Sequence, residues 1–73
     1  MTTATMTLAH AKRYDVRQGK RVVAFIVNAT IRGESAWRVL PSKPDIAARV
    51  PMPVPKHGSP AEALAWFNGV LAE

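Results

Sequence analysis

The sequence predicts a small α+β domain of order β-β-β-α, in which a C-terminal helix packs on a three-stranded antiparallel sheet. Three observations lead to this fold class. Residues 21–32, RVVAFIVNATIR, are rich in β-branched and aromatic residues and lack proline and glycine, which is typical of a strand. Shorter strand-like runs lie before and after this stretch, beyond turns that contain glycine. Near the C-terminus, apolar residues recur at helical spacing.

The 73 residues are expected to form a single domain (1–73), with a frayed or extended terminus at 1–10, a β-meander at 12–41, a proline-rich extended segment at 42–58 and a helix at 60–72. The N-terminal stretch is the least defined of these. It could also extend the first strand, with Met6, Leu8 and His10 on one side, or form a short helix.

The first two strands are expected to form a hairpin through a two-residue turn at Gln18-Gly19. This turn pairs Arg17 with Lys20, and it separates apolar from charged side chains. One face then carries Tyr14, Val16, Val23 and Phe25. The other face carries Arg13, Asp15, Arg17 and Lys20.

The third strand is expected at residues 36–40, AWRVL. A two-residue loop at Gly33-Glu34 would turn Trp37 to the polar side, whereas a three-residue loop turns it to the core and leaves Arg38 outside. We therefore expect the three-residue loop. The helix should then cover Tyr14, Val23, Phe25, Val27, Ile31, Trp37 and Val39.

The helix is the clearest element of the sequence. Ser59, Pro60 and Glu62 form a capping-box pattern, with serine at the N-cap, proline at N1 and glutamate at N3. An apolar stripe follows, made of Ala63, Leu64, Phe67, Val70 and Leu71. Gly69 weakens a helix, so we expect it to allow close packing against the sheet.

The stretch VPMPVPKHGSP, residues 50–60, connects the sheet to this helix. Its prolines disfavour helix at the preceding residues, and they stand at every second position rather than at the three-residue period of a polyproline helix. A docking peptide is the alternative. We expect a rigid extended segment that buries Val50, Met52 and Val54 and positions the helix N-cap.

An apolar patch is expected on the face of the sheet that the helix leaves open. Val22, Ala24 and Ile26 point to that face in the expected register, and a strand that is apolar on both faces is normally buried on both. The N-terminal segment, residues 46–54 or a second copy of the chain could cover it. We expect a homodimer or a small protein partner, because so small a core is weakly stable alone.

Enzymatic chemistry finds no support in the sequence. The two histidines have no acidic neighbour, cysteine is absent, and no glycine-rich nucleotide motif occurs. We therefore expect no catalytic residue, no metal ligand and no bound cofactor. No run reaches the roughly 20 apolar residues of a membrane span, so we expect a cytoplasmic protein without membrane association.

The net charge of +5 points to an anionic partner. Nucleic acid, DNA or RNA, is the leading hypothesis. The expected contacts are Arg13, Arg17, Lys20, Arg32 and Arg38, on or beside the open face. The layout of three strands followed by a helix resembles the integrase-type DNA-binding domains in topology. The alternative is a protein-interaction module, adaptor-like or antitoxin-like, that uses the apolar patch and an exposed edge strand.

Overall fold

The computed structural model describes residues 3–72, and it describes Ile31 by its backbone alone. Four strands form one antiparallel sheet in the order β1-β2-β3-β4. The strands are β1 (Thr5–His10), β2 (Arg13–Gln18), β3 (Arg21–Ile31) and β4 (Glu34–Pro41). The helices are α1 (Pro44–Ala47) and α2 (Pro60–Ala72). The α+β class, the antiparallel sheet and the C-terminal helix are confirmed, but the expected number of strands is wrong.

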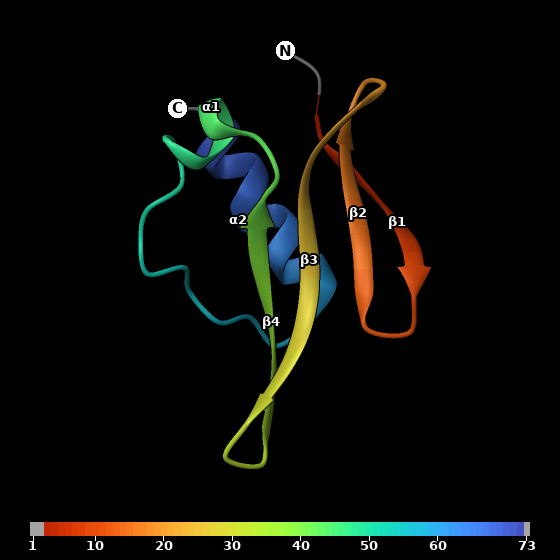
Figure 1. Ribbon diagram of the computed structural model, residues 1–73, viewed down its shortest axis with the longest axis vertical. Helices are drawn as coiled ribbons and strands as arrows, with labels where there is room; N and C mark the ends of the chain where they lie inside the picture. Colours follow the sequence, from red (N-terminus) through yellow and green to blue (C-terminus); the bar gives the residue numbers. More distant parts are fainter. Residues whose placement is uncertain (1–2, 73) are drawn as a thin grey trace.

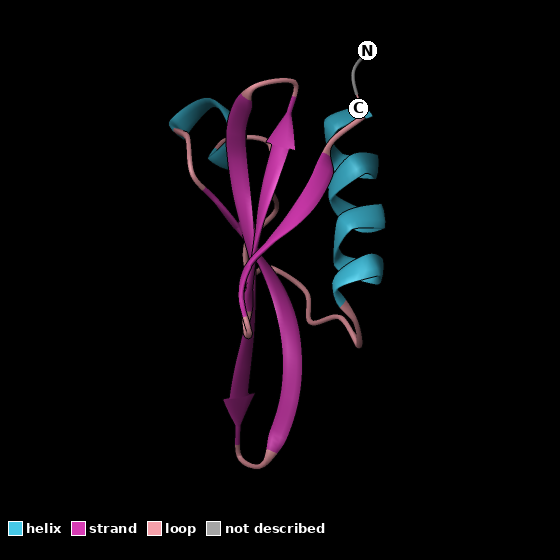
Figure 2. Ribbon diagram, turned by 90° about the vertical axis from the view of Figure 1, so that its right-hand side faces the viewer, coloured by secondary structure: helices cyan, strands magenta, loops and turns pink. Residues whose placement is uncertain are grey.

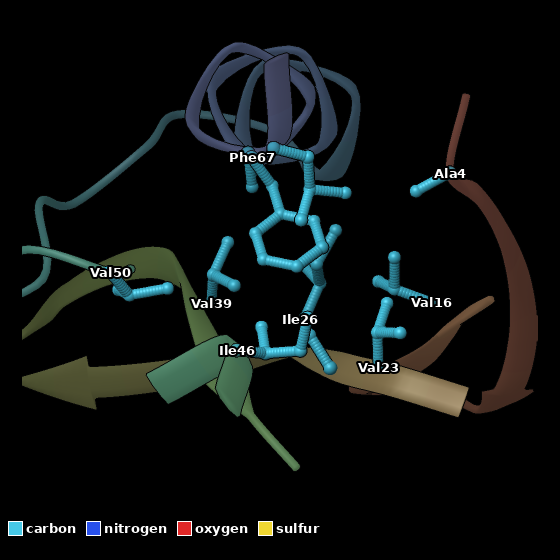
Figure 3. Packing of buried hydrophobic residues seen from close by; sticks show 11 residues of the cluster. Ala4, Val16, Val23, Ile26, Val39, Ile46, Val50 and Phe67 are labelled. Atoms are coloured by element: carbon cyan, nitrogen blue, oxygen red, sulfur yellow. The ribbon is translucent and has the colours of Figure 1, made fainter. Parts of the chain in front are cut away.

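Helix α2 lies along one face of the sheet. Strands β3 and β4 pass in front of it in Figure 1, and it stands beside the strands in Figure 2. Its residues Ala63, Phe67 and Leu71 are buried, which confirms the apolar stripe. Figure 3 shows Phe67 pointing from the helix toward Ile26 and Val39 on the sheet.

The N-terminal segment is a strand and not the frayed or extended terminus that the sequence suggested. Strand β1 pairs with β2 from Thr5↔Arg17 to His10↔Arg13. A side chain far away in the sequence holds its start: the Asn68 amide of α2 accepts from the Ala4 N–H at 2.9 Å and donates to the Ala4 carbonyl at 3.2 Å. The expected state of residues 1 and 2 lies outside the described part of the chain.

A β-bulge decides which side chains of β3 face the helix. Val16 pairs with Ala24 and Arg17 pairs with Val22, so Val23 is an extra residue on β3. Val23 and Ala24 are both fully buried. Since an extra residue shifts the alternation by one position, every side chain after it lies on the face opposite to that of an uninterrupted strand.

This inversion corrects several sequence-based assignments. Ile26 is fully buried beneath the helix, whereas Phe25 and Val27 lie on the far face with Asp15 and Arg13. Phe25 and Val27 were expected under the helix. The turn also differs from the expected Gln18-Gly19, because Gln18 pairs with Arg21 and the loop is Gly19-Lys20, with Gly19 at φ +66°. The expectation for the Ile31 side chain lies outside what the structure describes.

The β3–β4 loop has two residues rather than the expected three. Ile31 pairs with Glu34, and the turn residues Arg32 and Gly33 have φ of +53° and +82°. Positive φ at both positions is the signature of a type I′ turn, whose twist matches that of a hairpin. Trp37 pairs with Asn28, not with Ile31. Because of the bulge, Asn28 lies on the helix side of β3, so its partner Trp37 lies on the helix side of β4. There Trp37 packs against the core and against Tyr14.

The proline-rich segment is less regular than expected. Ile46 of the short helix α1 and Val50 enter the core, but Met52 is 77% exposed. At its end the segment lies against the outer edge of β4. His57 and Trp37 exchange two backbone hydrogen bonds of 2.9 Å in an antiparallel bridge.

The N-terminus of α2 is capped largely as the sequence predicted. The Ser59 hydroxyl accepts from the Glu62 N–H at 3.2 Å. The Glu62 carboxylate accepts from the N–H of Gly58 at 2.9 Å, one residue before the N-cap. Gly69 was expected to pack closely on the sheet. It is exposed instead, and an added Cβ would meet no atom within 4 Å.

Candidate nucleic-acid interface

The candidate site is the outer face, by which we mean the face of the sheet opposite α2. An apolar row crosses its middle, because Phe25 of β3 pairs with Leu40 of β4. Val27 lies next along β3, and Leu40 is 46% exposed. No helix is drawn across this face in Figure 1. The outer face therefore carries an apolar row at its centre.

Two of the predicted arginines flank that centre. Arg13 of β2 and Arg38 of β4 are both opposite Val27, one on each side. The Arg13 guanidinium lies 5.2 Å from the centre of the Phe25 ring, a cation–π arrangement, and its Nε is 3.6 Å from an Asp15 carboxylate oxygen. The Nε of Arg38 is buried and has no hydrogen-bond partner.

The remaining predicted contacts lie farther away. Arg17 is exposed on the outer face of β2, near the Gly19-Lys20 turn. Lys20 and Arg32 occupy turns at opposite ends of β3, at the top and the bottom of Figure 1. The structure thus brings Arg13, Arg17 and Arg38 to one face, and it does not gather all five cations into one cluster.

Other cations have structural partners away from the outer face. The Arg21 guanidinium donates to Asp45 of α1 at 2.8 Å. This hydrogen bond, together with the Arg21 charge, lowers the pKa of the Asp45 carboxyl. Arg49 donates to the Leu71 carbonyl at 2.7 Å, which satisfies an otherwise unpaired carbonyl at the C-terminus of α2.

The apolar patch that the sequence suggested is not on the surface. Ala24 and Ile26 are fully buried on the helix side, whereas Val22, which pairs with Arg17, lies on the outer face and is half-buried. The other apolar residues of β3 and β4 on the outer face are Phe25, Val27 and Leu40. Pattern reasoning missed them because strict alternation along β3 hides the bulge, and the run VVAFIV is apolar at every position.

Strands β3 and β4 extend beyond the rest of the sheet. The β2–β3 pairs end at Arg13↔Val27, whereas the β3–β4 pairs continue to Ile31↔Glu34. We call the free end of this hairpin, residues 29–36, the ribbon. It projects beyond the other elements at the bottom of Figure 1.

Within residues 3–72, no group of three or more His, Cys, Asp or Glu residues is close enough to hold a metal ion. No helix in that range is long and apolar enough to cross a membrane. His57 is half-buried, and its ring centre lies 5.5 Å from that of Trp66. In comparisons with known proteins, no family model, curated protein or solved structure matches this chain.

Proposed function

We propose that this chain binds nucleic acid through the outer face of its sheet. One observation carries the proposal: Arg13, Arg17 and Arg38 reach the face that α2 leaves open, and they come from two different strands. Asp15 shares that face and is paired with Arg13. The face is therefore a positive surface within a chain of net charge +5.

Arginine suits phosphate recognition because its planar guanidinium donates two parallel hydrogen bonds and stays charged at any physiological pH. Binding of this kind releases counterions from the nucleic acid, so the affinity falls steeply as salt rises. Sequence preference does not follow from phosphate contacts alone. The proposed role is a small accessory or regulatory binding domain without an enzymatic step of its own.

A double variant tests the proposal. Arg17→Ala with Arg38→Ala removes two positive charges from the outer face. Arg21→Ala with Lys43→Ala removes two from the end of the molecule that carries α1, and serves as the control. Affinity for a labelled oligonucleotide is measured by fluorescence anisotropy over a series of salt concentrations. We expect the first variant alone to flatten the slope of log K against log salt by about 2, because each arginine that neutralises a phosphate adds about 1 to that slope.

Equal losses of affinity in the two variants would show that only net charge matters, and the outer face would then not be the site. Salt-insensitive binding by the wild-type chain would contradict the proposal directly.

A protein partner on the same face is the second candidate. The observation that favours it is the exposed Leu40 beside Phe25 and Val27, since apolar surface in the centre of a patch is typical of protein interfaces. Replacing Leu40 by Glu would abolish such an interaction. For nucleic acid, the same change would only add one unfavourable charge.

A further inference from the structure

We propose that the ribbon enters the major groove of double-stranded DNA and presents Arg32 there. This inference rests on the proposed function and names the class of nucleic acid that the chain binds. It is carried by the shape of the ribbon, by the charges around its base and by the residue at its tip.

The dimensions of the ribbon fit the groove. Arg32 at the turn lies four positions beyond Asn28, whose N–H bonds the β1–β2 turn, and this is about 13 Å at about 3.3 Å per residue. The major groove of B-form DNA is about 8.5 Å deep and about 12 Å wide, and it admits a two-stranded β-ribbon. The four-stranded sheet behind the ribbon is wider than the groove and cannot enter it. The ribbon can therefore enter the groove only as far as its base.

Small residues occupy the part of the ribbon nearest the sheet. These are Ala29 and Thr30 on β3, and Ser35 and Ala36 on β4. Where the ribbon leaves the sheet, the Asn28 amide donates to the Ser35 hydroxyl at 2.7 Å and ties the two strands together. The β3–β4 hairpin therefore projects beyond the sheet, and a side-chain hydrogen bond joins its two strands at the base.

Cations stand on both sides of the base of the ribbon. Lys12 lies in the β1–β2 turn, where its carbonyl accepts from the Asn28 N–H at 3.0 Å. Arg13 follows it on β2. On the opposite side, Lys56 precedes His57, which pairs with Trp37 of β4 at the base of the ribbon. The Lys56 side chain is 59% exposed, and its amine lies 4.0 Å from the Glu34 carboxylate farther along the ribbon. A ribbon inside a groove has a phosphate backbone on each side, and these cations lie where those two backbones would pass.

The residue at the tip is not the one that the backbone favours. Arg32 adopts a φ of +53° in a type I′ turn, where Asn or Gly at this position is much preferred. Arginine thus occupies a position where folding alone would select another residue. A guanidinium at the tip of the ribbon can make the bidentate contact to guanine that the major groove offers.

The central test uses Arg32→Asn, because asparagine suits the turn and should leave the fold at least as stable as that of the wild type. Affinity is measured for double-stranded DNA, single-stranded DNA and double-stranded RNA of equal length. A-form RNA has a deep, narrow major groove that side chains cannot read. We expect wild type to prefer double-stranded DNA, and Arg32→Asn to weaken that complex about tenfold while the complexes with the other two probes change little.

Two matched pairs separate groove entry from general electrostatics. Lys43→Ala removes a positive charge at the end of β4 far from the ribbon, and it should weaken DNA binding much less than Arg32→Asn does. Glu34→Gln removes a negative charge from the ribbon, where the side chain is 81% exposed, and should tighten binding. Asp45→Asn makes the same charge change in α1 and should tighten it less.

The outcomes distinguish the two proposals. Salt-dependent binding that is lost with the outer-face arginines but unchanged by Arg32→Asn, or that shows no preference for double-stranded DNA, would overturn the ribbon inference and leave the proposed function standing. Failure of the wild-type chain to bind any of the three probes would overturn both.

Discussion

Replacing Asn68 by Ala should release the first strand of the sheet. The Asn68 side chain occupies the place of a neighbouring strand, since its amide satisfies both the N–H and the carbonyl of Ala4. A net contribution of about 1 kcal/mol per hydrogen bond gives about 2 kcal/mol for the pair. Alanine is the better helix former by about 0.6 kcal/mol, which offsets part of that loss. We therefore expect the free energy of unfolding to fall by about 1.4 kcal/mol.

This loss would be a large fraction of the roughly 3–5 kcal/mol available to a domain of this size. Urea denaturation measures it, with Gly69→Ala in the next position of the helix as the control for helix propensity. Native-state hydrogen exchange should show faster exchange in β1 than in β3. If Asn68→Ala is as stable as wild type and β1 stays protected, then the amide does not hold the strand and the reasoning fails.

Three further predictions follow from the packing and charges. Gly69→Ala should raise the free energy of unfolding by about 0.5–1 kcal/mol in urea denaturation, since a Cβ there meets no atom. Ile26→Ala should lower it by about 2–5 kcal/mol, and Val27→Ala by much less; equal losses would contradict the bulge. Arg21→Ala should raise the pKa of Asp45 in an NMR titration. The pKa of Asp45 is lower in the folded protein than in the unfolded chain. The Arg21–Asp45 pair therefore stabilises the fold at pH values above the pKa of Asp45 in the unfolded chain, and this stabilisation is lost as the pH falls through the pKa of Asp45 in the folded protein.

Local signals in the sequence predicted the helix correctly. Ser59, Pro60 and Glu62 lie within four residues of one another, and the apolar stripe that follows needs no partner to be recognised. The structure agrees on the helical span and on the hydrogen bond that Ser59 accepts. Prediction succeeded here because the signals lie within a few neighbouring residues.

The sheet could be predicted only in part, because its register depends on contacts between distant residues. Ala4, the residue before β1, is held by Asn68, which lies 64 residues away. The bulge at Val23 leaves no mark in a run that is apolar throughout. One extra residue was enough to exchange the faces assigned to Phe25 and Ile26.

The face on which three of the arginines lie was predicted better than the register of β3. Arg13 and Arg17 precede the bulge in the chain and lie on β2, so the inversion on β3 leaves their face unchanged. Arg38 also lies on the outer face, although by a different pairing than the one expected. The extent of the ribbon could not be predicted, because it depends on where β2 stops pairing with β3.

The two edges of the sheet differ in how they would receive another chain. At β4, His57 already occupies the middle of the edge through its two hydrogen bonds with Trp37, and Pro55 shortly before it has no N–H to donate. Strand β1 forms the other edge, and its sequence TMTLAH contains no proline, lysine, arginine or acidic residue. Natural edge strands usually carry such residues as protection against the addition of further strands. Aggregation at high concentration should therefore begin at β1, and a lysine in place of the 58% exposed Leu8 is the substitution best placed to suppress it.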